Sequence, residues 1–202
     1  FSAARRAADF AIAEYFDEEG GGFFDRASGA PPMGGLELRR KPLQDSPSPG
    51  ANSTAAMLLA RMHGYTSDAR YVKCAEATLE AFAAIAPQFG IHAASYGLAA
   101  VLHARGPFEV VVTGASDDPQ AAALERAANS VYRFGKAVLR VTPARMASPR
   151  ALAPALAETL PHLRADVAQA LVCVGTTCRP PVTDPAALIA LLTQKPIVLS
   201  AE

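Results

Sequence analysis

Two cysteines near the C-terminal end form the most distinctive chemical pattern in the sequence. Cys173 and Cys178 are separated by four residues, and a Pro-Val-Thr-Asp-Pro run follows them. A thiol reacts as its thiolate, which a nearby cation favours, and Arg179 directly follows Cys178. Three interpretations stay open: buried structural thiols, a redox pair that closes a disulfide or exchanges with one, and a metal site. Zinc is disfavoured because it needs two further ligands, and His162 is the only histidine after Gly106.

A long loop that carries two carboxylates is the second candidate site. It runs from Asp25 to Asn52 and is rich in Gly, Pro and Ser, and loops of this length are usually functional. Sugar chemistry needs two carboxylates that flank the reacting carbon, about 5 Å apart for retention and further apart for inversion. We therefore predict Asp25 and Asp45 as catalytic residues and Lys41 and Asn52 as ligand-binding residues. Two alternatives are ligand contact without catalysis, and a structural role in which Asp45 forms an Asx-turn and Asn52 caps a helix.

The elements that must position this loop are helices. Apolar residues at helical spacing predict helices over 3–16, 52–63, 67–86 and 91–104. Asn52-Ser53 and Ser67-Asp68 are the expected N-caps of the second and third helices, and Cys74 falls on the apolar face of the third, as expected for a core residue. Short connections suit antiparallel hairpins, but the alanine-rich faces would stay uncovered without further helices.

The pattern changes from helical to extended at Gly106-Pro107. Extended runs over 108–113, 137–141 and 170–174 alternate with helices expected to start at Asp117-Asp118-Pro119, Ser148-Pro149 and Asp184-Pro185. A capping residue followed by Pro is typical of a helix start. The alternation predicts a small three-stranded parallel sheet with right-handed crossovers. The predicted domains are a helical segment over 1–105 and a small α/β domain over 106–202.

Composition excludes several functional classes. The 202 residues include 19 basic and 19 acidic ones, so no nucleic-acid partner is expected. No apolar stretch approaches the ~18 residues of a membrane span. Gly20-Gly21-Gly22 lacks the spacing of a dinucleotide loop, and no cofactor is expected. The start at Phe1, without Met or a signal pattern, indicates a cut within a longer protein, and three cysteines favour the cytoplasm.

Three segments resemble a known family. They are residues 41–53 with their Lys-Pro-Leu-Gln-Asp and Pro-Gly-Ala-Asn-Ser runs, residues 106–112, and residues 173–185 with the two cysteines. Their order is similar to that in the C-terminal third of the thioredoxin-domain-containing protein family, which includes the YyaL-like and the spermatogenesis-associated thioredoxin-like proteins. One position departs from the family pattern: Ser48 stands where the family's loop has Glu before Pro, so any acid–base role of that Glu is in doubt here.

The resemblance implies a fold and two competing functions. It implies an N-terminal thioredoxin-like domain, an (α/α)6 toroid similar to those of sugar epimerases and six-hairpin glycosidases, and a small terminal α/β domain. Residues 1–105 would then be part of an incomplete toroid, and the protein would bind or process a sugar-like small molecule. The alternative is redox exchange between Cys173, Cys178 and the thioredoxin-like domain of the same protein. A third possibility is a purely structural docking domain.

Overall fold

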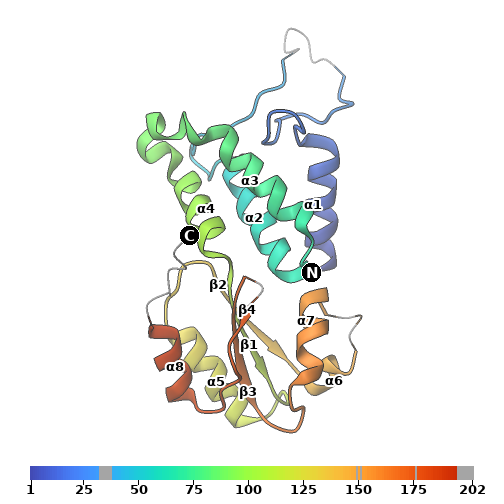
Figure 1. Cartoon of the computed structure of the whole chain (residues 1–202), viewed down its shortest axis with the longest axis vertical. Coiled ribbons are helices and arrows are strands. Elements are labelled where there is room, and N and C mark those ends of the chain that lie inside the picture. Colours follow the sequence, from blue (N-terminus) through green and yellow to red (C-terminus); the bar gives the residue numbers. More distant parts are fainter. Residues whose placement is uncertain (32–37, 149, 151, 176, 195–202) are drawn as a thin grey trace. The chain divides into compact units, whose positions relative to one another are not determined.

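The computed structural model describes residues 1–31, 38–148, 150, 152–175 and 177–194, and the chain divides into two compact units (Figure 1). The first unit comprises Phe1–Pro107 with Ala153–Ala155, and the second comprises Phe108–Leu152 with Leu156–Glu202. Among the helices described, none combines the length and the apolar character that crossing a bilayer requires.

The first unit is helical, as the sequence predicts. Its elements are α1 (Ser2–Tyr15), α2 (Ala51–Thr66), α3 (Ala69–Ala83), the 3-10 helix η1 (Ala86–Ala93) and α4 (Ala94–Arg105). The helix predicted over 91–104 begins later, at Ala94, because Ala93 has φ −122 and ψ 27, outside the helical region, and the residues directly before it belong to η1. Helices α2 and α3 form a hairpin whose turn contains Ser67 in the left-handed region, at φ 57.

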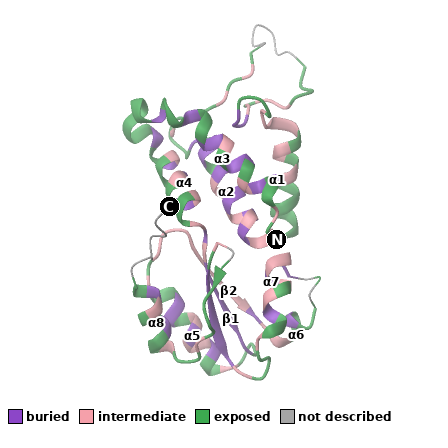
Figure 2. Ribbon diagram, viewed as in Figure 1, coloured by how far each residue is buried: buried purple, intermediate pink, exposed green. Residues whose placement is uncertain are grey.

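Helix α1 packs against this hairpin through a small apolar core. Its buried members come from α1, the following turn, α2 and α3: Ala8, Phe23, Leu59, Met62, Tyr71, Cys74 and Ala75. Within α1 only Ala8 is buried, and Figure 2 shows most of that helix as exposed or intermediate. The placement of Cys74 confirms the predicted core role. Full burial of a side chain as large as Leu59 contributes about 1.5–3 kcal/mol.

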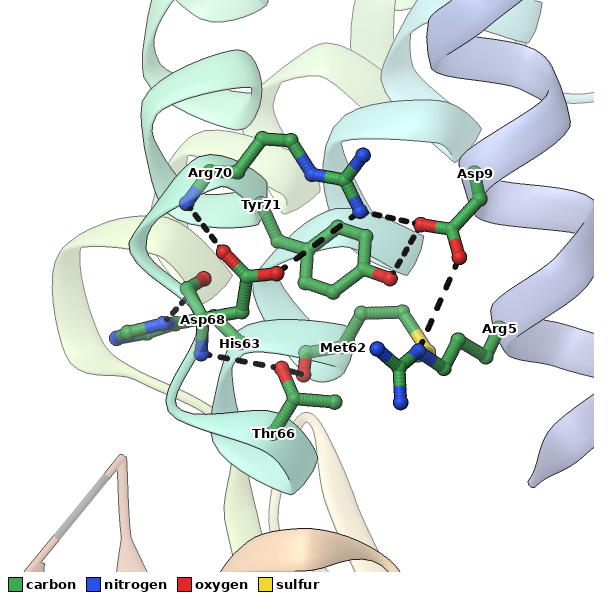
Figure 3. A network of polar contacts seen from close by, with 8 residues as sticks. All are labelled: Arg5, Asp9, Met62, His63, Thr66, Asp68, Arg70 and Tyr71. Carbon is green, nitrogen blue, oxygen red and sulfur yellow. Dashed lines mark hydrogen bonds and ion pairs between the residues drawn. The ribbon is translucent and has the colours of Figure 1, made fainter.

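A polar network supplements that core where α1 meets the start of α3 (Figure 3). The Asp9 carboxylate accepts a hydrogen bond of 2.6 Å from the Tyr71 hydroxyl and forms ion pairs with Arg70 and Arg5. The hydrogen bond from Tyr71 is the main cause that lowers the pKa of Asp9. Asp68 caps α3 by accepting from the Arg70 N–H at 2.9 Å. These contacts fix α1 through charge as well as packing.

The second unit contains a four-stranded sheet in the order β2-β1-β3-β4. Its strands are β1 (Phe108–Thr113), β2 (Lys136–Val141), β3 (Gln169–Val174) and β4 (Thr177–Cys178), and its helices are α5 (Pro119–Ser130), α6 (Pro143–Met146), α7 (Pro154–Thr159), the 3-10 turn η3 (Leu160–His162) and α8 (Pro185–Thr193). Strands β1 and β2 are parallel, as predicted. The prediction of a three-stranded parallel sheet was otherwise wrong: β3 is antiparallel to β1, and β4 is a fourth strand antiparallel to β3.

Along each strand, alternate side chains point to opposite faces of the sheet. Val110, Val112, Ala170 and Val172 pack with α5 and α8 in the main core. Val111 and Leu171 point to the opposite face, because side chains alternate along a strand, and both are buried. Figure 1 shows α6 on that side. The sheet is therefore covered on both faces.

Aspartate caps define the two helices of the main core. The Asp118 carboxylate accepts from the Gln120 N–H at 2.8 Å, and Asp184 accepts from the Ala187 N–H at 3.0 Å, each directly before a proline. Both predicted starts are confirmed. For the start predicted at Ser148-Pro149, Pro149 lies outside the described residues, and the neighbouring helices α6 and α7 begin at Pro143 and Pro154.

Candidate functional site

Cys173 and Cys178 are joined by a disulfide across the β3–β4 pair. Their Cα atoms are 4.0 Å apart, and the two residues are directly opposed in the antiparallel register. Cys173 is 5% exposed and lies within β3, whereas Cys178 is exposed at the edge of the sheet. Cys173 thus belongs to the interior of the sheet, and Cys178 to its exposed edge.

Backbone pairing holds the two cysteines together independently of their sulfurs. The Arg179 N–H donates to the Val172 carbonyl at 2.8 Å, so the adjacent cysteines occupy a non-hydrogen-bonded position, where opposed side chains lie closest. Beyond them Val182 pairs with Ala170 through hydrogen bonds of 2.8 and 2.9 Å. The Cys178 segment is therefore anchored along β3 on its C-terminal side.

Two prolines explain why β4 is short. The register shifts by one residue between the Val172–Arg179 pair and the Ala170–Val182 pair, which leaves room for an extra residue where Pro180 and Pro181 lie. Proline lacks the N–H needed by a ladder and is confined to edges and bulges. The prolines thus end regular pairing next to Cys178 and keep the disulfide at an exposed edge.

Cys74 does not belong to this site. It is a free thiol in the core of the helical unit, 9% exposed. Burial raises the pKa of the Cys74 thiol, which suppresses the thiolate that reacts. Among the described residues there is no group of three His, Cys, Asp or Glu side chains that could hold a metal ion.

The two loop carboxylates bind separate backbone groups. Asp25 accepts from the Arg40 N–H at 2.9 Å. Asp45 accepts from the Gly50 N–H at 2.7 Å and from the Ser95 N–H at 2.8 Å, and these bonds, that of Ser95 foremost, lower the pKa of the Asp45 carboxyl. Among the described residues, Asp25 and Asp45 therefore share no hydrogen-bond partner in these contacts. Their role in sugar chemistry stays a prediction.

Lys41 binds the turn at Gly20–Gly22, and Asn52 binds Phe23 directly after that turn. The Lys41 ammonium forms an ion pair of 2.6 Å with Asp17 and donates to the Gly21 carbonyl. The Asn52 amide accepts from the Phe23 N–H at 2.6 Å and donates to the Phe23 and Pro42 carbonyls at 3.0 and 2.8 Å. Ligand contact by Lys41 and Asn52 stays a prediction.

The predicted N-cap role of Asn52 was wrong. Helix α2 begins at Ala51 with Gly50 at its N-cap position, and Asn52 is buried at 1% exposure. Gly50 is favoured there because an added Cβ would meet the Leu43 carbonyl oxygen at 2.2 Å. The close approach of the loop to the helix start places Asn52 where its amide can bind two backbone segments.

Sequence reasoning missed the turn at Gly20–Gly22 as part of this assembly. Gly21 has φ +64, and a Cβ on it would lie 2.2 Å from the Ala77 carbonyl oxygen, so the turn lies directly against α3. A Cβ on Gly22 would lie 3.2 Å from the Asn52 amide oxygen. Three consecutive glycines were the available signal, because backbone packed this closely requires residues without a side chain.

Comparison with known proteins gives one limited similarity. The human Spermatogenesis-associated protein 20 is 30% identical to this chain over 183 residues, which is 88% of the chain and 22% of that protein. The chain therefore spans about a fifth of the length of this curated relative. No protein-family model matches the chain, and no solved structure matches it.

Proposed function

We propose that Cys173 and Cys178 form a dithiol–disulfide exchange site whose partner is a thioredoxin-like domain of a longer protein. The observation that carries the proposal is the asymmetry of the bonded pair: Cys178 is exposed, and Cys173 is buried behind it. An incoming thiolate can reach only an accessible sulfur. The buried sulfur then becomes the leaving group and later the resolving thiol.

The exchange conserves two electrons and two protons. A thiolate of the partner dithiol attacks the Cys178 sulfur, and the disulfide electron pair leaves on Cys173, which takes up one proton. The partner's second thiol, once deprotonated, then attacks the partner's first sulfur, which is bonded to Cys178 in the mixed disulfide. This expels Cys178 as a thiolate, which takes up the second proton. The partner ends oxidised and this pair ends as two thiols.

A purely structural crosslink is a weaker explanation of the same bond. A disulfide that closes so short a loop, five residues in sequence separation, stabilises a fold by about 2 kcal/mol in the loop-entropy model. The backbone pairs of Arg179 and Val182 already align this segment. The cysteine count also predicts a reducing compartment, where disulfides are mostly transient and catalytic or redox-sensing.

Trapping a mixed disulfide tests this proposal. Cys173→Ala keeps the exposed thiol of Cys178, and Cys178→Ala keeps only the buried one, with Cys74 present in both. Incubation with oxidised glutathione, followed by peptide mass mapping, is expected to modify Cys178 in the first variant at least about tenfold faster than Cys173 in the second. Equal rates at Cys173, Cys178 and Cys74 would contradict the assignment.

A sugar-like ligand of the helical unit is the second candidate function. Its first candidate carboxylate is Asp45, which accepts hydrogen bonds from the Gly50 and Ser95 N–H groups and would act as the ionised nucleophile or charge stabiliser of sugar chemistry. Asp25 is the proposed second carboxylate, with Lys41 and Asn52 as ligand contacts. A panel of sugars in a thermal shift assay tests this: a specific binder raises the melting temperature, and Asp45→Asn should abolish that rise. No rise with any sugar would argue against the site.

Exposed apolar side chains support the further proposal that these helices belong to a larger toroid. Ile91 is 82% exposed, and Phe89, Leu98 and Val101 are exposed at 36%, 46% and 38% on η1 and α4. Contiguous apolar surface usually marks a contact. Limited proteolysis of the longer protein tests this: the proposal expects η1 and α4 to be protected there and cleaved in this chain alone. Equal cleavage would speak against companion helices.

A further inference from the structure

Strand β4 leaves an edge of the sheet open beside the disulfide. It is the last strand in the order β2-β1-β3-β4, so among the described strands its only neighbour is β3. Thr177, Cys178 and the three residues that follow them are all exposed. The edge of a sheet presents backbone N–H and C=O groups that can pair with another extended chain. The accessible sulfur of Cys178 therefore lies on a surface that can bind backbone.

The register of β3 and β4 decides which backbone groups face the open edge. In an antiparallel pair, positions that are hydrogen-bonded to the neighbouring strand alternate with positions that are not. Arg179 is hydrogen-bonded to β3, because its N–H donates to the Val172 carbonyl. Cys178 is opposed to Cys173 at the next position, which is not hydrogen-bonded, so the N–H and C=O of Cys178 point away from β3. The residue with the accessible sulfur thus also carries the outward-facing donor and acceptor.

Two prolines limit how far a second chain can pair with this edge. Pro180 lies two residues beyond Cys178, where the alternation along the strand would next turn an N–H outward. Proline has no N–H to donate, and prolines at an edge prevent extensive strand-to-strand association. The edge therefore suits a short extended segment at Cys178 and not a continuation of the sheet.

We propose that the thiol-bearing segment of the exchange partner docks on β4 as an added antiparallel strand, with its attacking cysteine directly opposite Cys178. The inference rests on the proposed function and specifies the chemistry of the partner, an extended segment whose cysteine has a free N–H and C=O. The N–H of that cysteine donates to the Cys178 carbonyl, and its carbonyl accepts from the Cys178 N–H. Main-chain pairing of this kind supplies the affinity of sheet edges that bind peptides.

This pairing also places the sulfurs for reaction. Directly opposed residues project to the same face of a sheet. Their Cα atoms are about 5.5 Å apart at a hydrogen-bonded position, within the range of about 4.4–6.8 Å that a disulfide spans. Displacement at sulfur requires the attacking thiolate on the side opposite the leaving group. Because Cys173 lies on β3, that side of Cys178 is the open edge.

The docked cysteine then carries out the first step of the exchange. Its thiolate forms a bond to the Cys178 sulfur as the bond between Cys178 and Cys173 breaks. The electron pair leaves on Cys173, which takes up a proton. The product is a mixed disulfide that lies across a newly formed strand pair, so the partner stays docked while its second thiol completes the exchange.

N-methylated peptides test the pairing on the oxidised wild-type chain. The probes are short blocked peptides with a central cysteine between valine and threonine residues. The mixed disulfide at Cys178 is quantified by mass spectrometry after an acid quench, and rates are compared per thiolate. A methyl on the cysteine nitrogen removes the N–H that faces Cys178, so that peptide should react at least about tenfold more slowly than the unmethylated one.

The matched control is a methyl on the residue next to the peptide's cysteine. Successive residues of a strand turn their N–H groups to opposite sides, so this N–H points away from β4 and its loss should change the rate by less than about twofold. Mercaptoethanol, a thiol without a backbone, gives the rate of exchange in the absence of any pairing. A two-residue period in the effect of methylation is therefore the expected result.

Hydrogen exchange gives a second readout that does not depend on rates. In Cys173→Ala, a mixed disulfide at Cys178 accumulates because the resolving thiol is absent. The Cys178 amide should be protected from exchange in the adduct with the unmethylated peptide. It should exchange freely in the adducts with mercaptoethanol and with the peptide methylated at cysteine.

The outcomes separate this inference from the proposed function. Equal rates for all the peptides, or a Cys178 amide that stays unprotected, would overturn the docking mode and leave exchange at Cys178 in place. Protection of the Cys178 amide without peptide, in a dimer that forms as concentration rises, would assign the edge to a second copy of the chain and also overturn it. Failure of the wild type to form a mixed disulfide with any of these thiols would instead overturn the proposed function.

Discussion

The side chain of Asn52 pairs with the backbone of Phe23 as if it were a neighbouring strand, accepting from its N–H at 2.6 Å and donating to its carbonyl at 3.0 Å. A third bond, to the Pro42 carbonyl at 2.8 Å, ties in the long loop. One buried amide therefore joins α2, the glycine turn and the loop that carries the predicted ligand residues.

Asn52→Ala should destabilise the helical unit by roughly 2–4 kcal/mol, because it removes three hydrogen bonds and leaves buried backbone groups without them. Urea denaturation followed by tyrosine fluorescence measures this. Asn129→Ala, at an exposed position of α5, should change the free energy of unfolding by less than about 0.5 kcal/mol. Equal effects of the two substitutions would contradict the claim that the Asn52 hydrogen bonds stabilise the helical unit.

Gly21→Ala should be more damaging than an ordinary glycine substitution. Its φ of +64 disfavours a side chain, and the added Cβ would lie 2.2 Å from the Ala77 carbonyl oxygen, so we expect a loss of at least about 1–2 kcal/mol. Gly97→Ala is the matched control, since no atom lies within 4 Å of its Cβ position in α4. There alanine should stabilise by up to about 1 kcal/mol. A neutral result at Gly21 would contradict the close packing of the turn.

The network around Asp9 predicts acid sensitivity. The Tyr71 hydrogen bond lowers the pKa of Asp9 below its ordinary value of 3.8, so the carboxylate's contribution to stability is complete above pH 3.8 and is lost as pH falls through the lowered pKa. Partial exposure limits that contribution to about 1 kcal/mol. Asp9→Asn should flatten this part of the curve of unfolding free energy against pH. An unchanged slope in Asp9→Asn would show that other carboxylates account for it.

Reduction of the disulfide should leave the sheet intact. The Arg179 and Val182 amides donate to β3 whether or not the sulfurs are bonded, and the crosslink contributes only about 2 kcal/mol. Hydrogen exchange of the reduced protein should therefore still find both amides protected. Free exchange of the two amides on reduction would mean that the disulfide itself holds the edge strand.

Local patterns predicted most elements of both units. The β-branched run of Phe108–Thr113 gave β1 its observed bounds, and Asp118-Pro119 and Asp184-Pro185 gave α5 and α8. The same cap-and-proline pattern at Thr142-Pro143 marks the start of α6, and it was overlooked. Strand direction could not be predicted, because β3 is buried at nearly every position and such a strand looks the same in either direction.

The candidate site was predictable in its residue types and less so in its contacts. The spacing of Cys173 and Cys178 allowed a disulfide, but only the pairing of β3 with β4 brings the sulfurs together. Asn52 resembled a helix cap because asparagine is common there, and its actual partners come from a distant turn.

An equilibrium redox titration of the wild-type chain tests the exchange proposal most directly. The protein is equilibrated with mixtures of reduced and oxidised dithiothreitol or glutathione, free thiols are alkylated, and the Cys173–Cys178 peptide is quantified by mass spectrometry. An exchange site should have its midpoint between about −270 and −120 mV, the range of proteins that transfer disulfides. A midpoint below about −300 mV, typical of structural disulfides, would contradict the account.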